Sequence, residues 1–362
     1  MTVSTPRSTV RSSSSASSRM TSSYTELAQT IRESGLLERR HGYYWSRMGL
    51  AVAAFLATAT GVVVLGNSWW QLLVAAVLGL IITQFGFLGH DAAHRQIFTS
   101  AAWNDWTARI LSGAFAGLSY GWWKGKHNRH HAAPNQESRD PDIRSGVLAF
   151  TSDVAAARGE GARGWFLRRQ GWLFFPLLTF EGLNLHVAGL RVLCGRGPVP
   201  HRMVELTLVV TRLGAYVVGL LILLPPGKAV AFFLVQMAVL GLCLGGSFAP
   251  NHKGMPIVPA TMKLDFLRRQ VLMSRNVRGG LFVDAAMGGL NYQIEHHLFP
   301  SMPRPNLKRA QPIVRAYCAD LELPYAELGL VASYAVVVDY LNHVGLHARG
   351  PFECPLAVDL RG

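Results

Sequence analysis

Residues 71–94 read QLLVAAVLGLIITQFGFLGHDAAH. An apolar run from Gln71 to Gly89 leads without interruption into a segment with two histidines, His90 and His94. The run approaches the ~20 residues that a helix needs to cross a hydrocarbon core, and residues four positions apart lie on one face of a helix. The stretch therefore predicts a membrane-spanning helix that ends in two side chains able to bind a metal.

Three further apolar runs have a similar length, and they are Met48–Gly66, Val204–Leu224 and Ala229–Ala249. Asn67–Ser68 is a two-residue turn between the first two spans, and Pro225–Lys228 is a helix-stopping turn between the last two. We therefore expect an all-α integral membrane protein whose four transmembrane helices form two hairpins.

Two shorter apolar stretches, Ile110–Trp123 and Trp172–Leu193, fall between the hairpins. The first is short and the second contains Glu181, so both are expected to be helices that lie in the membrane interface or against the spans. Arg212 and Gln236 interrupt the third and fourth spans. Polar residues at that depth usually face other helices or a cavity.

The composition excludes an ordinary soluble enzyme. Of the 362 residues, 50% are hydrophobic and 15% are charged, and the mean hydropathy is +0.21; soluble domains carry about 25% charged residues. The net charge of +14 is not accompanied by a nucleic-acid-binding motif, so no nucleic-acid partner is expected. The four cysteines form no C-x-x-C pair, which argues against a disulfide framework, a zinc ribbon or an iron–sulfur cluster; they are Cys194, Cys243, Cys318 and Cys354.

The distribution of basic residues predicts the orientation in the membrane. Residues 1–47, 90–203 and 250–362 carry 7, 14 and 12 Lys or Arg, whereas the two hairpin turns contribute only Lys228. The positive-inside rule places these three segments in the cytoplasm. Only 6 of the 35 basic residues are lysines, which is typical of a GC-rich bacterial genome, so a bacterial plasma membrane is expected.

Three regions are expected along the chain. Residues 1–25 are predicted to be a disordered tail, because residues 1–23 contain ten serines and no acidic residue. Residues 26–320 form the membrane domain, and residues 321–362 form a C-terminal cytoplasmic tail.

Eight of the thirteen histidines lie in three short boxes and at one position beyond the last span: His90, His94, His127, His130, His131, His252, His296 and His297. Helical spacing directs the imidazoles of each box to one side. All four segments lie on the same side of the predicted membrane, so they can converge. Imidazole suits iron, zinc or copper, and eight nitrogen ligands exceed the capacity of one metal, so two metal ions are implied. His343 and His347 share the spacing without a partner box and are interpreted as incidental.

The boxes Gly89–His94, His127–His131 and Gln293–Pro300 resemble the three histidine boxes of the membrane fatty acid desaturases in composition, order and interval. The resemblance covers about residues 45–320. It implies a non-haem di-iron centre at the cytoplasmic face, held under a helical cap, with His252 matching an additional histidine of the family. The third box begins with Gln293, and in this respect the sequence resembles the acyl-lipid and front-end branch of the family.

The resemblance implies O₂-dependent formation of a double bond in a fatty acyl chain, carried either by a lipid or by CoA. Zinc has no redox chemistry and could not support this reaction. Because no H-P-G-G haem motif occurs in the chain, the electrons are expected to come from a separate donor such as ferredoxin or cytochrome b5. Residues near the boxes that could bind the metals or orient the imidazoles are Gln293, Asp91, Asn128, Asn135, Asp140, Asp142 and Glu295.

Two other classes of function remain open on the sequence. A histidine-box lipid hydroxylase, a ketolase or a sphingolipid desaturase would share the metal site and differ in product. A non-enzymatic metal transporter or receptor is disfavoured, since transport sites lie near the middle of the membrane and these boxes follow the spans.

Overall fold

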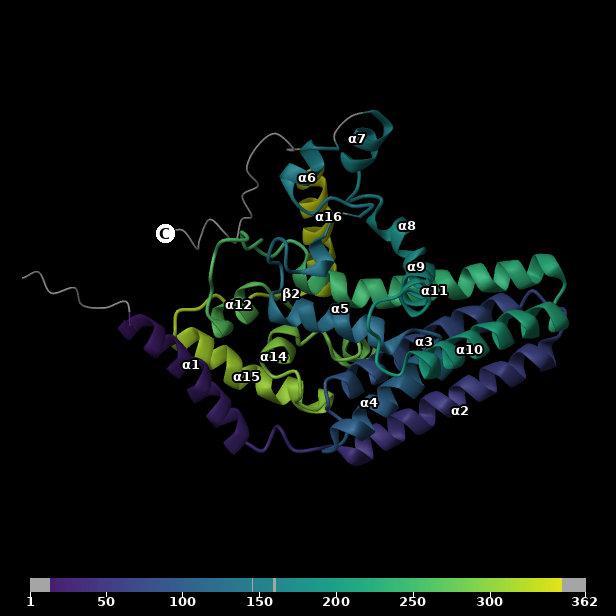
Figure 1. Cartoon of the computed structure of the whole chain (residues 1–362), viewed down its shortest axis with the longest axis horizontal. Helices are drawn as coiled ribbons and strands as arrows, with labels where there is room; N and C mark the ends of the chain where they lie inside the picture. The colour runs from purple at the N-terminus through teal and green to yellow at the C-terminus, as the bar shows by residue number, and fades with distance from the viewer. Residues whose placement is uncertain (1–13, 145, 159–160, 347–362) are drawn as a thin grey trace, which may run out of the picture.

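Four long apolar helices form one part of the molecule. The structure, a computed structural model, describes residues 14–144, 146–158 and 161–346. The four helices lie alongside one another in Figure 1 and are α2 (His41–Leu65), α3 (Gln71–Ala93), α10 (Arg202–Leu223) and α11 (Pro226–His252). Each is long and apolar enough to cross a membrane. The prediction of four spans is thus confirmed in length and composition.

These helices carry large apolar side chains on their outer surfaces. Val64 on α2 and Ile222 on α10 are 77% and 76% exposed. Soluble monomers rarely expose extended apolar surface, whereas lipid tails would cover it. The exposure therefore agrees with helices that lie in a membrane.

Helices α3 and α11 pack closely through a glycine. A Cβ atom at Gly79 would come within 2.9 Å of the Gln236 carbonyl oxygen and of Val239 on α11. Small residues allow such close approach between membrane helices. The side chain of Gln236 is buried, and Arg212 Nε donates to the Phe115 carbonyl oxygen at 3.0 Å. Both polar residues within the spans therefore face other elements, as the sequence predicts.

Helices α3 and α11 continue beyond their predicted apolar runs. The runs end at Gly89 and Ala249, whereas the helices end at Ala93 and His252. Backbone hydrogen bonding does not require apolar side chains, so the last turn of each helix extends into the polar region. As a result, two long helices carry His90 and His252 on their ends.

The remaining elements lie mostly beyond one end of the four helices (Figure 1). They are α1 (Ser14–Glu33), α4 (Ala101–Ile110), the π-helix η1 (Leu111–Ala116), α5 (Tyr120–Ala132), the 3₁₀ helix η2 (Pro141–Ile143), α6 (Ser152–Ala156), α7 (Gly161–Leu167), α8 (Phe174–Leu178), α9 (Glu181–Leu193), α12 (Phe266–Leu272), β1 (Asn276–Arg278), α13 (Leu281–Ala286), α14 (Gln293–Leu298), α15 (Arg304–Asp320), β2 (Glu327–Gly329) and α16 (Leu330–Leu346). The strands β1 and β2 pair in parallel, with Asn276 opposite Glu327. The all-α prediction omitted them, because three residues are too few to show an alternating pattern.

Both stretches predicted to lie at the interface are divided in the structure. Residues 110–123 contain the end of α4, the π-helix η1 and the start of α5, with Gly117 at φ +72° between them. Residues 172–193 contain α8 and α9. α9 has 13 residues, which is shorter than a membrane crossing requires.

Helices α1 and α16 overlap the two segments of the chain that were predicted to be tails. α1 begins at Ser14, and its Leu27 and Ile31 are buried in one cluster with side chains of α15. At the other end, Val337 and Leu341 of α16 are also fully buried. Residues 1–13 and 347–362, which include His347 and Cys354, lie outside the described residues. The domain boundaries at 25 and 320 stay predictions. The other three cysteines are free thiols.

Candidate metal centre

Eight histidines from four separate segments converge in the structure. They lie on or just beyond α3, on α5, at the end of α11 and on α14. Their ring nitrogens form two groups, in each of which one nitrogen per residue lies within 4.8 Å of the others. The first group consists of His90, His94, His127, His131 and His296, and the second consists of His130, His252 and His297.

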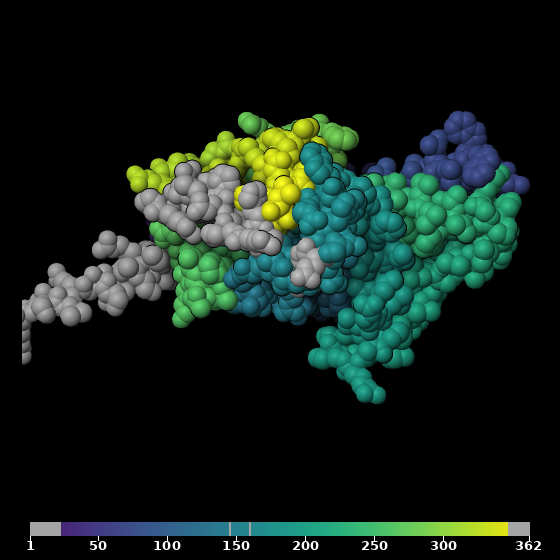
Figure 2. Space-filling model, turned by 90° about the horizontal axis from the view of Figure 1, so that it is seen from above, coloured from purple at the N-terminus to yellow at the C-terminus, as the bar shows by residue number. Residues whose placement is uncertain are grey.

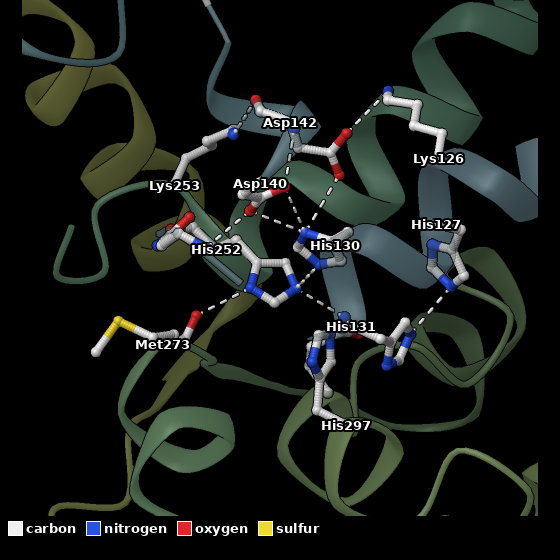
Figure 3. Close-up of polar contacts among 12 residues, drawn as sticks. Lys126, His127, His130, His131, Asp140, Asp142, His252, Lys253, Met273 and His297 are labelled. Atoms are coloured by element: carbon white, nitrogen blue, oxygen red, sulfur yellow. Dashed lines mark hydrogen bonds and ion pairs between the residues drawn. The ribbon is translucent and has the colours of Figure 1, made fainter. Parts of the chain in front are cut away.

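Helix α5 contributes to both groups because of its helical spacing. His127 and His131 are four residues apart and face the first group, whereas His130 faces the second (Figure 3). Nε2 of His127 lies 2.9 Å from Nε2 of His94 and 3.0 Å from Nε2 of His131. Nε2 of His130 lies 3.2 Å from Nε2 of His252. The nitrogens of each group are therefore directed at one another.

The two groups touch. The imidazole rings of His131 and His297 are stacked, with centroids 4.2 Å apart and an angle of 16° between their planes. His131 belongs to the first group and His297 to the second. The groups are therefore adjacent halves of one centre.

The nitrogen atoms of this centre fit metal ions. Several are buried and have no hydrogen-bond partner among the described residues, and they include Nε2 of His90, Nδ1 of His131, both nitrogens of His296 and Nε2 of His297. Buried polar atoms are nearly always paired. Burial and the neighbouring imidazoles lower the pKa of His131, His296 and His297 well below its ordinary value. The neutral rings thus offer lone pairs of the kind that iron, zinc or copper binds.

Two carboxylates hold His130 on the side away from the other histidines. Its Nδ1 donates to Asp140 at 3.0 Å, and Asp142 lies 3.4 Å away. Burial raises the pKa of Asp140, but the hydrogen bond from His130 outweighs this effect and holds the pKa below its usual value. The carboxylates keep the proton on Nδ1, so the lone pair of Nε2 faces the second group.

The other two histidines of the second group are oriented by the segment that contains α12. His252 Nδ1 donates to the carbonyl oxygen of Met273 at 2.9 Å, and His297 Nδ1 donates to Gln270 Oε1 at 2.9 Å. Gln270 Nε2 in turn donates to the carbonyl oxygen of His131 at 3.0 Å. Each ring is thereby fixed with its Nε2 directed toward the other histidines of the group.

Comparison with known proteins agrees with this geometry. The family model described as fatty acid desaturase matches residues 67–329. The chain belongs to the fatty acid desaturase family. It is 29% identical to a delta(8)-fatty-acid desaturase of Helianthus annuus over 90% of the chain and 74% of that protein. It is 31% identical to an acyl-lipid (9-3)-desaturase of Physcomitrium patens over 83% of the chain and 58% of that protein. It is 29% identical to a delta(6)-fatty-acid desaturase of Caenorhabditis elegans over 91% of the chain and 76% of that protein.

Four of the residues that the sequence proposed around the boxes of this desaturase are in contact with the histidines. Asp140 and Asp142 face His130, as described above. Gln293 is buried, with its Nε2 2.9 Å from His252 Nε2, so its amide lies at the second group. Asp91 Oδ1 lies 3.4 Å from His90 Nδ1.

The other three proposed residues have different surroundings. Asn135 donates to the carbonyl oxygens of His252 and Pro256, at 3.0 and 3.2 Å, and so holds the backbone that follows α11. Glu295 accepts hydrogen bonds from Tyr325 Oη at 2.6 Å and Asn276 Nδ2 at 2.8 Å, which link the third box to the segments around β1 and β2. Asn128 is exposed and lines an open surface groove.

Sequence analysis of the desaturase missed Gln270, Met273 and Arg304. Arg304 Nη2 lies 2.5 Å from Asp91 Oδ2, beneath the first box. None of the three belongs to a histidine box, and Met273 acts through a backbone carbonyl that every residue type possesses. No local signal in the sequence could have identified them.

Proposed function

We propose that this desaturase forms a carbon–carbon double bond in a fatty acyl chain, using O₂ and a pair of iron ions held by the eight histidines. The observation that carries the proposal is the convergence of eight imidazoles, with buried and unpaired ring nitrogens, in two touching groups. The names of the relatives, which are fatty-acid and acyl-lipid desaturases, support a fatty acyl substrate.

Each group of histidines would hold one iron. The first offers five imidazoles, and the second offers three, with the side chain of Gln293 beside His252. When bound, the irons supply the O₂-derived oxidant that an unactivated methylene requires. In the balanced reaction, –CH₂–CH₂–, O₂, two electrons and two protons give –CH=CH– and two water molecules.

The residues around the histidines hold the rings in place and restrict water. Asp140, the Met273 carbonyl and Gln270 each accept a hydrogen bond from the Nδ1–H of one ring of the second group, which directs the Nε2 atoms inward. Beside the first group, the indole of Trp123 stacks on His127 with centroids 4.3 Å apart, and the Phe248 ring lies 6.4 Å from that of His90. Such apolar surfaces suit an acyl chain and exclude water from the reacting carbons.

In the same proposal, the four spans form two hairpins in a plasma membrane, and the metal centre lies under the helical cap on the cytoplasmic side. The asymmetry of Lys and Arg between the turns and the other polar segments supports this orientation. The division into a tail at 1–25, a membrane domain at 26–320 and a tail at 321–362 also belongs to the proposal. The electrons would come from a separate ferredoxin or cytochrome b5.

The protein should be purified in mild detergent and also expressed in a bacterium that lacks desaturases. We expect close to two iron atoms per chain, and new unsaturated fatty acids in the lipids of the host by mass spectrometry. Stoichiometric zinc in the active protein would contradict the di-iron proposal. Hydroxylated acyl chains in place of unsaturated ones would identify a hydroxylase.

Alanine substitutions separate the proposed ligands from a histidine with no such role. His131→Ala and His297→Ala should each abolish activity while the protein remains in the membrane. Gln293→Ala should retain an intermediate activity, since an amide is a weaker ligand than imidazole. His343→Ala, on α16, is the matched control and should keep most activity. Equal losses in His343→Ala and His131→Ala would contradict the assignment of ligands.

A further inference from the structure

Helix α12 presents basic side chains on the surface directly above the metal centre. Its sequence is FLRRQVL, in which Arg268 is exposed, Arg269 is half-buried and Gln270 is buried. The side chain of Arg269 donates to the carbonyl oxygen of Ala132 at 3.0 Å, so α12 lies against the end of α5.

Two neighbouring segments extend this basic surface. Glu137 N donates to the Val258 carbonyl oxygen at 3.0 Å, which places residues 136–139 beside residues 258–263. Arg139 and Lys263 lie on these segments and are exposed. Arg139 is close enough to Arg269 to lower the pKa of that guanidinium, in addition to the effect of burial.

We name the surface formed by Arg139, Lys263, Arg268 and Arg269 the basic patch. The same segments, residues 132–139 and 258–272, contain two acidic residues, Glu137 and Asp265. Asp265 is engaged within α12, where it accepts from Arg268 N at 3.0 Å and pairs with the Arg268 guanidinium at 3.1 Å. The patch therefore carries a net positive charge.

Gln270 connects the basic patch to both groups of histidines. It is adjacent in sequence to Arg269, and its side chain is hydrogen-bonded to His297 Nδ1 and to the His131 carbonyl oxygen. His297 belongs to the second group and His131 to the first, and their rings are stacked. A single buried side chain thus links this surface to both halves of the metal centre.

We propose that the basic patch is the docking surface for a small acidic electron-carrier protein, and that electrons enter the metal centre through Gln270. The proposal rests on the proposed function, whose reaction takes two electrons from a donor for each double bond. The carrier supplies two electrons and is oxidised. The –CH₂–CH₂– unit supplies the other two as it becomes –CH=CH–, so that O₂ is reduced to two water molecules. Complementary charge accelerates the encounter of such partners and orients them.

The position of the patch favours a soluble protein over the membrane surface. Helix α12 lies at the end of the molecule opposite the turns that join α2 to α3 and α10 to α11 (Figure 1). The space-filling view shows the same separation, with the green segment that includes α12 at the left and the tips of the long helices at the right (Figure 2). Lipid headgroups at the turn end of the spans are therefore remote from α12. At the other end, helix α5 separates α12 from α10, since the start of α5 is hydrogen-bonded to Glu205 of α10 and its end to Arg269 of α12.

The test compares two ways of supplying electrons to the iron-loaded, full-length protein in detergent. One uses a reduced acidic ferredoxin as the probe, and the other uses dithionite. Lys263→Glu/Arg268→Glu reverses two charges of the patch, and Lys263→Gln/Arg268→Gln removes them. Arg163→Glu/Arg168→Glu makes the same change in net charge at exposed positions outside the patch. Iron content is measured for every variant.

We expect the charge reversal to slow ferredoxin-driven product formation at least about tenfold at low salt. The neutral variant should show a smaller loss, and high salt should reduce the difference between variants and wild type, since it screens surface charge. Product formed with dithionite and iron content should not change. The Arg163→Glu/Arg168→Glu control should behave as wild type.

Three outcomes would overturn the proposal. The first is a ferredoxin-driven rate that the patch variants do not change, and the second is an equal loss of product formation with both reductants. The third is that the patch variants lose only the binding of phosphatidylglycerol vesicles, which would make the patch a lipid contact. Failure of the proposed function is distinguishable, because the wild-type protein would then give no unsaturated product with either reductant.

Discussion

Gln270 holds two histidine-bearing helices at once. Its Oε1 accepts from His297 on α14 and its Nε2 donates to the His131 carbonyl oxygen on α5. In Gln270→Ala, the His297 ring loses the acceptor that fixes its orientation. Loss of such a partner typically costs about 10–100-fold in metal affinity. We expect a loss of this size, measured as iron retained in competition with a chelator.

Asn128→Ala is the control for this experiment. Asn128 lies next to a histidine in the sequence but is exposed in the structure, so its replacement should leave iron retention at the wild-type level. Retention by Gln270→Ala equal to that of Asn128→Ala would show that the hydrogen bonds of Gln270 do not stabilise the centre.

The contrast between Asn128 and the histidines of α5 also explains what spacing can predict. Consecutive residues of a helix are separated by about 100° around its axis. His127, His130 and His131 share a side, and the sequence therefore predicted their convergence, whereas Asn128 points elsewhere. Glu295 is separated from His296 by the same single step and bonds with Tyr325. A residue next to a histidine in the sequence therefore contacts the metal centre only if it lies on the same side of the helix.

At the scale of whole elements, the start of α5 depends on a carboxylate from a long apolar helix. Glu205 on α10 is 1% exposed. It accepts from Ser119 Oγ at 2.9 Å, from Gly121 N at 3.0 Å and from Arg109 Nε at 3.3 Å. A negative charge at a helix N-terminus is stabilising. Glu205 therefore anchors the helix that carries three of the eight histidines to α10.

Glu205→Ala should destabilise the protein through this anchor. It leaves the buried guanidinium of Arg109 without its counter-charge, and breaking a buried ion pair typically costs about 3–5 kcal/mol. We expect a lower midpoint of thermal unfolding in detergent and weaker iron retention. Glu205→Gln preserves the shape of the side chain and keeps one oxygen that accepts hydrogen bonds, so it should lose less. Equal midpoints for Glu205→Ala and wild type would refute the anchoring role.

The sequence predicted well those elements that are marked by a long run of apolar residues. A run of about twenty apolar residues is recognised in the sequence without knowledge of its neighbours. The four long helices were therefore found, with ends that differ from the predicted ones by up to seven residues. The π-helix η1 and the strand pair β1–β2 were not predicted. They depend on contacts between distant segments, such as Asn276 with Glu327, which no local pattern contains.

At the scale of the whole molecule, the turns of the two pairs of long helices are joined to each other. Lys228 Nζ donates to the backbone oxygen of Asn67 at 3.0 Å and to its side-chain oxygen at 2.6 Å. The ammonium also lies 5.1 Å from the centre of the Trp69 ring. Both turns therefore lie at the same end of the structure, and the metal centre lies toward the other end.

This arrangement makes the orientation testable with few probes. Reporter tags at residues 67 and 227 should both map to the outer side of the membrane, and tags at 150 and 340 should map to the cytoplasm. The physical reason is that the basic residues concentrate in the segments outside the turns, and basic loops remain inside. Protease protection of intact cells or spheroplasts provides the measurement.

The pair of tags at the turns acts as an internal control, since the contact between Lys228 and Asn67 requires both to lie on one side. If the tags at 67 and 227 mapped to opposite sides, the helices could not be arranged as they are in the structure. If the tag at 150 mapped outside while that at 340 mapped inside, α5 and α14 would lie on opposite sides of the membrane. The eight histidines could then form no common centre, and the proposed function would fail with them.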